Sequence, residues 1–226
     1  MGLDILAVGA HPDDVEIAIG GTLIKMVAMG HSVKICDLTD GEPTPLGDRD
    51  TRFKEASASA SVIGVERITL DMPNRYLEDT PESRRMLALV IRELQPALLL
   101  APYPGGEHPD HITASSIADG ARFYAKLTKS DMHGEPWPGD PWWTPRIFYY
   151  LGLGACEHYV RPSFIVDISQ QYAEKMKALA CYKTQKAVVE RLSQSSAHYG
   201  PVIQARHAEA FFSRTPVTVS DLFDLC

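Results

Sequence analysis

Two short polar segments of the sequence combine imidazole and carboxylate side chains at spacings that suit a metal ion. Residues 10–16 read AHPDDVE and residues 105–111 read GGEHPDH, so each segment has a His-Pro-Asp core. Histidine nitrogens and carboxylate oxygens are common ligands of catalytic zinc, which keeps a further position open for water. If the fold brings the two segments together, the sequence predicts a metal centre that activates water.

The spacing within the segments indicates which residues would bind the ion. His11 and Asp14 lie three residues apart, as do His108 and His111, and such pairs share one face of a first helical turn. Two imidazoles and one carboxylate suit a catalytic zinc, so we predict His11, Asp14 and His111 as ligands. The first segment alone is more typical of a turn in which Asp13 and Asp14 complement a helix dipole, and the second alone could equally be a polar loop.

The remaining polar side chains are candidates for proton transfer. Asp13 would lie beside the metal without binding it and act as a general base for water, whose pKa zinc lowers. His108, as an imidazolium, would stabilise a tetrahedral oxyanion or protonate a departing amine. Asp110 would hold the His108 ring in the required tautomer. These roles are those of an amide hydrolase.

An alternation of apolar runs and helical patterns predicts the elements that position these segments. Strands are expected at residues 3–9, 32–38, 67–70 and 97–101, and helices at residues 15–29, 51–63, 81–94 and 110–124. This order implies right-handed crossovers and a parallel sheet with helices on both faces. Ligands bind beyond the carboxyl ends of the strands in such sheets. The two segments follow the first and fourth strands, so they would meet at one edge.

The pattern changes in the second half of the chain. Residues 125–145 contain four prolines and all three tryptophans and are expected to form a long loop, in which Trp142 and Trp143 favour a packing role over stacking on a sugar. Further elements are expected as strands at residues 146–151 and 164–168, a helix capped by Ser169 and ending near Lys186, and a last helix near residues 201–212. We predict one α/β domain, residues 1–226, with a Rossmann-like, doubly wound, mostly parallel sheet.

Composition narrows the range of partners and compartments. The chain has 226 residues and a net charge of −7, which argues against nucleic-acid or anionic-membrane binding, because both usually need a basic surface. No apolar run approaches the roughly 18 residues of a membrane span. The four cysteines are scattered without a C-x-x-C pair, so reduced thiols and a cytoplasmic location are expected.

The two segments together resemble the signature of the PIG-L/LmbE-like zinc de-N-acetylases, and the similarity runs through most of the chain. It is closest to the bacillithiol-biosynthesis branch, which hydrolyses the acetamide of N-acetylglucosaminyl malate; residues 101–103, 166–169 and 182–185 resemble that branch. The resemblance implies zinc ligands at His11, Asp14 and His111, a general base at Asp13, and His108 assisting the tetrahedral intermediate with Asp110 orienting it.

The resemblance also implies substrate contacts. Arg52 matches an arginine that the family places near the substrate, and Tyr199 lies where some members offer a hydroxyl to the oxyanion, although residues 193–199 depart from the longer loop expected there. Arg52 has an alternative as a helix-start arginine paired with Asp48 or Asp50 on the surface, and Tyr199 as an ordinary loop tyrosine. Further arginine candidates at the same edge are Arg49 and Arg75.

We therefore expect a zinc-dependent hydrolase that removes the N-acetyl group from an N-acetylglucosaminyl conjugate, with N-acetylglucosaminyl malate as the substrate and a homo-oligomeric assembly implied by the family. Fe²⁺ can fill similar nitrogen and oxygen sites. The alternatives are a deacetylase of another N-acetylated sugar, or a non-catalytic sugar- or nucleotide-binding Rossmann-like protein. A nucleotide site would need G-x-G-x-x-G after the first strand, whereas Gly9-Ala10-His11 interrupts that pattern and Gly20-Gly21 lie inside the predicted helix.

Overall fold

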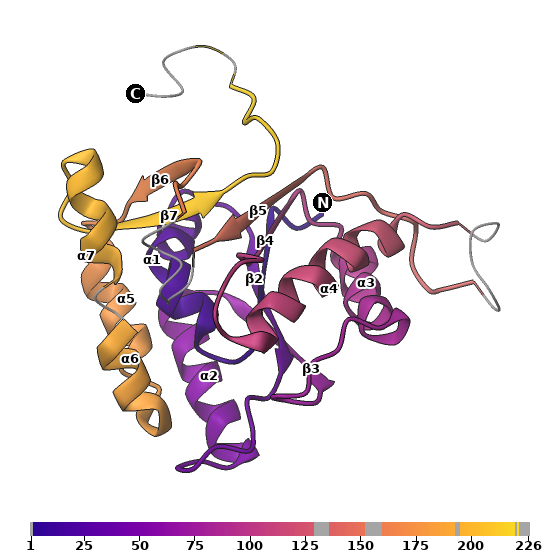
Figure 1. Ribbon diagram of the computed structural model, residues 1–226, viewed down its shortest axis with the longest axis horizontal. Coiled ribbons are helices and arrows are strands. Elements are labelled where there is room, and N and C mark those ends of the chain that lie inside the picture. Colours follow the sequence, from indigo (N-terminus) through magenta and orange to yellow (C-terminus); the bar gives the residue numbers. More distant parts are fainter. Residues whose placement is uncertain (1, 129–135, 152–159, 193–194, 220, 222–226) are drawn as a thin grey trace.

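The fold is built on one seven-stranded sheet with the strand order β3-β2-β1-β4-β5-β7-β6 (Figure 1). The computed structural model describes residues 2–128, 136–151, 160–192, 195–219 and 221. The strands are β1 (Ile5–Gly9), β2 (Val33–Thr39), β3 (Glu66–Met72), β4 (Leu98–Pro102), β5 (Arg146–Tyr150), β6 (Phe164–Asp167) and β7 (Ala208–Phe212). The helices are α1 (Asp14–Ala28), α2 (Arg49–Ile63), α3 (Pro81–Leu94), α4 (Pro109–Ala125), α5 (Tyr172–Leu179), α6 (Lys186–Leu192) and α7 (Ser195–Tyr199), with 3₁₀ turns η3 (Lys183–Gln185) and η4 (Gly200–Ile203).

The first five strands run parallel, which confirms the predicted sheet. β1 pairs with β2 on one side and with β4 on the other, so the strand order reverses at β1. Only β7, among the described strands, runs antiparallel to its neighbours, β5 and β6. A crevice opens beyond the carboxyl ends of the strands at such a reversal and is the usual ligand site of doubly wound sheets.

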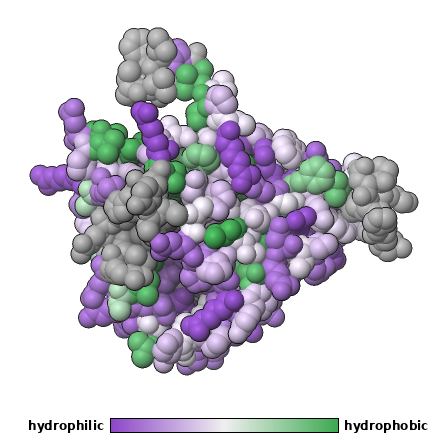
Figure 2. Space-filling model, viewed as in Figure 1, coloured by the Kyte–Doolittle hydropathy of each residue, from purple (hydrophilic) through white to green (hydrophobic). Residues whose placement is uncertain are grey.

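Helices cover both faces of the sheet because the central strands are apolar on both sides. Along β1, Leu6 and Val8 pack toward α3 and α4, whereas Ile5 and Ala7 pack toward α1, as the two-residue repeat of a strand requires. Figure 1 shows α3 and α4 on one side of the sheet and α1, α2 and α5 on the other. On the face drawn in Figure 2, apolar side chains form small separate groups among polar ones.

The predicted last helix is wrong, because residues 208–212 form the strand β7. α7 and η4 precede it. The Ala- and Glu-containing sequence of β7 has a high intrinsic helix propensity, and residues 208–211 are all buried, so no polar alternation marks a strand. Pairing with β5 and β6 on its two sides decides the conformation.

The predicted helix from Ser169 to Lys186 is also corrected. It is divided into α5, η3 and the start of α6, and the cap residue of α5 is Gln171. The Ser169 hydroxyl instead accepts hydrogen bonds from the amides of Arg206 and His207. Ser169 therefore holds the segment before β7 and does not start a helix.

Of the tryptophan-rich loop, residues 129–135 lie outside the described residues. Trp142 packs against the core and its indole N–H donates to the Pro96 carbonyl at 3.0 Å, which agrees with a packing role. Trp143 differs, because it is 46% exposed and the Arg122 guanidinium stacks over it. Two cysteines, Cys156 and Cys226, also lie outside the described residues, while Cys36 and Cys181 are free thiols.

Within the described residues, none of the helices combines the length and apolar character needed to cross a bilayer.

A buried polar network fixes the first turn of α1 on the sheet. The Glu16 carboxylate accepts hydrogen bonds from Ser59, Tyr182 and Arg67, and Arg67 also donates to Asp37 of β2 at 2.9 Å. Burial alone would raise the pKa of Glu16, but the Arg67 guanidinium and these hydroxyl donors hold it below its ordinary value. The network therefore keeps Glu16 ionised and ties α1 to β2 and β3.

We predict that Glu16→Gln lowers the free energy of unfolding at pH 7 by about 3 kcal/mol, because it removes one partner of a buried ion pair. A carboxyl with a depressed pKa stabilises the fold above its unfolded pKa and loses that contribution as the pH falls through its folded pKa. The difference between wild type and variant should therefore shrink below pH 4.5, the ordinary value for Glu16. Urea unfolding of both proteins between pH 7 and a pH below 4.5 would measure this difference in the free energy of unfolding.

Glu66→Gln is the matched control, since its exposed carboxylate pairs with Lys34 on the surface. It should change stability much less than Glu16→Gln. Equal effects of the two substitutions would contradict a special role for the buried network.

Candidate metal centre and active site

The two His-Pro-Asp segments meet at one edge of the sheet, as the sequence predicts. β1 and β4 are parallel neighbours with Ile5 opposite Leu98, so the loops that follow them leave the same edge. The ring centroids of His11 and His108 are 5.0 Å apart, and those of His11 and His111 are 5.4 Å apart. Side chains from opposite ends of the first half of the chain thus face one another.

The three predicted ligands form a compact group. Asp14 Oδ1 lies 3.1 Å from His111 Nε2, and Asp14 Oδ2 lies 3.4 Å from His11 Nδ1. Tetrahedral zinc with bonds of about 2.1 Å separates neighbouring ligand atoms by about 3.4 Å. The spacing therefore fits a small divalent cation bound by His11, Asp14 and His111, and the donor types suit zinc or Fe²⁺.

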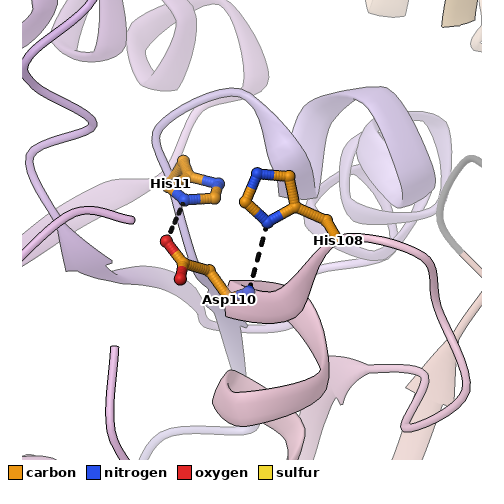
Figure 3. Close-up of side chains that lie close together, drawn as sticks. All are labelled: His11, His108 and Asp110. Atoms are coloured by element: carbon orange, nitrogen blue, oxygen red, sulfur yellow. Dashed lines mark hydrogen bonds and ion pairs between the residues drawn. The ribbon is translucent and has the colours of Figure 1, made fainter. Parts of the chain in front are cut away.

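A second group of possible ligands, His11, His108 and Asp110, overlaps the first. Figure 3 shows the contact of His11 with Asp110, in which His11 Nε2 is 3.0 Å from an Asp110 carboxylate oxygen. The other ring nitrogen of His11, Nδ1, lies 3.4 Å from Asp14 Oδ2. Metal-binding histidines commonly donate their other ring N–H to a carboxylate, which fixes the ring. This pattern favours the group of His11, Asp14 and His111.

The Asp110 carboxylate contacts His11, whereas the main-chain amide of Asp110 contacts His108. The carboxylate accepts from the Arg75 amide at 2.7 Å as well as contacting His11. Burial would raise the pKa of Asp110, but these two hydrogen bonds hold it below its ordinary value. Asp110 lies in the first turn of α4, and from there its carboxylate reaches His11 on the neighbouring loop.

His108 is held by a main-chain contact instead. It is the N-cap of α4, and its Nδ1 accepts the amide N–H of Asp110 at 3.2 Å (Figure 3). Burial, and then the positive charges of His111 and His11, lower the pKa of His108. Both the hydrogen bond at Nδ1 and the lowered pKa favour a neutral ring with its proton on Nε2 over the imidazolium.

The pKa values of His11 and Asp14 shift because the two side chains lie together. Burial would lower the pKa of His11, but the Asp14 charge and the hydrogen bond with Asp110 raise it to about 10. Burial would raise the pKa of Asp14, but the charges of His111 and His11 bring it well below its ordinary value. In the cation-free protein the Asp14 carboxylate is therefore deprotonated and His11 carries an extra proton, which a bound cation would displace.

Asp13 occupies the N-cap of α1 with a φ of 112°, a left-handed conformation that is uncommon outside glycine. Its carboxylate is 3.7 Å from Arg52 Nη1 and is 6% exposed as a residue. Burial and the neighbouring Asp14 charge raise the pKa of Asp13 to about 8, against the opposing effect of Arg52. A carboxyl that titrates near neutral pH suits proton transfer in both directions.

Arg52 lies inside the site and not on the surface beside Asp48 or Asp50. It is 2% exposed, and its Nη2 donates to the Pro12 carbonyl at 2.6 Å. Its Nε and Nη1 are buried without a hydrogen-bond partner among the described residues. Gly41 permits this position, because a Cβ there would lie 2.9 Å from Nη2.

The other predicted residues divide between the site and its surroundings. Tyr199 is buried in a separate apolar cluster with Leu151, Ala208 and Ala210, and it is not among the described residues that line the site cavity. Arg49 is exposed and pairs with Asp40 and Asp71. Arg75 lines the cavity, as expected for a residue at this edge.

The cavity at the metal centre has a volume of about 450 Å³. Sequence reasoning singled out Gln185 only within the stretch 182–185 that resembles the family branch, and it missed five further residues that line the cavity: Ile17, Gly41, Thr44, Asn74 and Val188. Asn74 follows β3 at the same sheet edge, and that position is a signal that could have identified it. Gln185 and Val188 come from η3 and α6, and the predicted parallel sheet gave no reason to place them here.

Comparisons with known proteins agree with this geometry. Residues 6–121 match the PIG-L family, described as GlcNAc-PI de-N-acetylase. The diacetylchitobiose deacetylase of Thermococcus kodakarensis is 30% identical over 196 residues, which cover 80% of this chain and 69% of that enzyme. The chain therefore belongs to the PIG-L family of de-N-acetylases.

Two further comparisons extend the similarity. The 1D-myo-inositol 2-acetamido-2-deoxy-α-D-glucopyranoside deacetylase of Nocardiopsis dassonvillei is 31% identical over 167 residues, which cover 58% of each chain. The crystal structure of the conserved protein TT1542 from Thermus thermophilus superimposes with a TM-score of 0.86 and 35% identity, covering 96% of this chain and 97% of that one. The fold is thus shared along nearly the whole chain.

We predict that Asp14→Ala and His111→Ala each abolish stoichiometric metal binding, because each removes a ligand from a three-residue set. His108→Asn should retain the ion, since asparagine caps a helix well and His108 lies outside that set. Metal content after dialysis against trace zinc would be measured for all three variants. Loss of metal in His108→Asn with retention in His111→Ala would place the ion with Asp110 instead.

We also predict that zinc affinity rises with pH between 6 and 8. His11 is protonated in this range in the cation-free protein, because its pKa is about 10, so binding through Nδ1 must release a proton. Competition with a chelator, corrected for the chelator's own protonation, would give the dissociation constant at each pH. An affinity independent of pH would contradict the assignment of His11 as a ligand.

Proposed function

We propose that this PIG-L family member is a zinc-dependent hydrolase that removes the N-acetyl group from an N-acetylglucosaminyl conjugate, giving a free amine and acetate. The observation that carries the proposal is the meeting, in one cavity, of a three-residue ligand set, the buried carboxyl of Asp13, and His108 with its Nδ1 held by a main-chain amide. These groups supply the base and the hydrogen-bond donor that amide hydrolysis requires.

His11, Asp14 and His111 would hold the ion. When bound, a divalent cation polarises a carbonyl oxygen and makes water a better nucleophile at neutral pH. Zinc is the proposed metal, and Fe²⁺ would fit the same donors. The Asp110 carboxylate, through its contact with His11 Nε2, orients the ligand ring.

Asp13 would move the proton. In its ionised form it takes a proton from the attacking water, and in its protonated form it gives that proton to the departing nitrogen. The same residue can do both because its pKa lies near neutral pH in the cation-free protein, and because Arg52 lies 3.7 Å away and favours the ionised form.

His108 would stabilise the oxyanion as a neutral donor. Its Nδ1 accepts the Asp110 amide, which leaves the Nε2–H to bond the oxygen that becomes negative during attack. A neutral donor gains most in a site that excludes water.

Arg52 supports an anionic or hydroxyl-rich substrate. Its Nε and Nη1 are buried and lack hydrogen-bond partners among the described residues, and a buried guanidinium of this kind favours a ligand oxygen. Arg75 lines the same cavity. Two arginines within a chain of net charge −7 suit a carboxylate-bearing conjugate, and we propose N-acetylglucosaminyl malate. The homo-oligomeric state and the cytoplasmic location stay predictions.

The test is acetate release from a panel of N-acetylglucosaminyl malate, diacetylchitobiose and the N-acetylglucosaminyl inositol conjugate, with metal analysis of the same preparation. The malate conjugate should give the highest kcat/KM. Arg52→Lys should lower kcat/KM most for this substrate, because lysine cannot reproduce the planar guanidinium. Zinc-loaded protein that releases acetate from none of the three would refute the proposal.

We predict that Asp13→Asn retains zinc but lowers kcat by a factor of about 10² to 10⁴, the usual contribution of a general base. Asp71→Asn, an exposed carboxylate that pairs with Arg49, is the control and should leave kcat unchanged. If zinc and turnover disappear together in Asp13→Asn, Asp13 is a ligand and not the base.

A further inference from the structure

The helix that carries the site residues is broken one turn beyond them. Ile19 of α1 has φ −137° and ψ 15°, outside the helical range. In an unbroken helix the Ile17 carbonyl would accept the Gly21 amide. A break at this position separates the first turn, with Asp14 and Glu16, from the remainder of α1. Contacts from outside the helix must therefore fix the direction of that first turn.

A buried ion pair fills the break. Lys175 Nζ donates to the Ile17 carbonyl at 2.7 Å and lies 2.7 Å from Glu209 Oε1. Glu209 in turn accepts the amides of Gly21 at 3.0 Å and Thr22 at 2.6 Å. The pair therefore satisfies the carbonyl on one side of the break and the amides on the other, as kinks with an inserted side chain do.

Both charged residues come from the far end of the chain and are fully enclosed. Lys175 lies on α5 and is 0% exposed, while Glu209 lies on β7 and is 2% exposed. Gly21 allows the approach, because a Cβ there would lie 2.9 Å from Ile168 Cβ and 3.1 Å from Glu209 Oε1. Within the Gly20-Gly21 pair, Gly21 therefore serves this contact.

The pair lies two hydrogen bonds from the site. Lys175 holds the Ile17 carbonyl, the Ile17 amide donates to the Asp13 carbonyl at 2.9 Å, and Ile17 itself lines the cavity. Desolvating two charges is expensive, and apolar side chains of similar size often stabilise a fold as well or better. A contribution to stability alone therefore does not account for this pair.

We propose that Lys175 and Glu209 are positioning residues, which set the direction of the first turn of α1 and so hold Asp13 and Asp14 in register with His11 and His111. The inference rests on the proposed metal-dependent hydrolysis, but it does not depend on which sugar conjugate is the substrate. In this proposal, Lys175 and Glu209 of the C-terminal part of the chain influence metal affinity although neither residue contacts the ion.

Two variants test the proposal. Lys175→Met/Glu209→Gln removes both charges, so no unpaired charge is buried, but it leaves the Ile17 carbonyl without its donor. Glu209→Asp keeps both charges and shortens the carboxylate, so it cannot reach Lys175 and both amides together. We expect each variant to fold, to bind zinc about tenfold more weakly, and to lose kcat with little change in KM.

Ile91→Ala provides the control for lost stability. Ile91 is a buried residue of α3, in the core on the opposite face of the sheet from α1. Its truncation should lower the melting temperature and leave zinc affinity unchanged. Zinc affinity is measured by chelator competition without turnover, which separates this inference from the proposed function.

The outcomes separate clearly. Wild-type protein that binds no zinc refutes the proposed function before any variant is compared. If wild type binds zinc and both pair variants match it in affinity and kcat, the pair is purely structural and the inference is overturned. It is also overturned if both pair variants fail to fold while Ile91→Ala folds, because the pair is then a folding element.

Discussion

The parallel pairing of β1 with β4 is the constraint on which the site depends. These strands are neighbours at the point where the strand order reverses, so the loops after them open toward one crevice. Each loop carries one His-Pro-Asp segment, and each segment begins a helix. The pairing of the two strands therefore fixes the distance between the two loops that carry the proposed ligands, and the side-chain rotamers make only the final adjustment.

Several acidic side chains are buried in and near this edge of the sheet, where their negative charges repel one another. Buried arginine and lysine side chains lie beside many of them. Arg52 lies beside Asp13, Arg67 bridges Glu16 and Asp37, and Lys175 pairs with Glu209. An isolated buried carboxylate would protonate or destabilise the fold. The ligand carboxylate of Asp14 has its pKa lowered by His111 and His11 instead, while burial and the Asp14 charge raise the pKa of Asp13 to about 8 against the effect of Arg52.

The sequence allowed the ligand set and most of the N-terminal fold to be predicted, because strand and helix periods are local properties and the i, i+3 spacing of histidine and carboxylate is explicit. It predicted His108 as the partner of the Asp110 side chain, whereas the N-cap geometry of α4 places His108 on the Asp110 amide and leaves the Asp110 carboxylate to His11. β7 was missed because its residues are buried on both faces, and the burial of Arg52 followed from tertiary packing.

Gln185 and Val188 complete the cavity from the last third of the chain, and Thr184 secures that wall by donating to Glu55 of α2. The proposed ligands and proton-transfer residues all lie within the first 111 positions. One wall of the cavity is therefore supplied by a stretch far along the chain from the proposed ligands. Substitutions near residues 184–188 would change the shape of the cavity without replacing any proposed ligand.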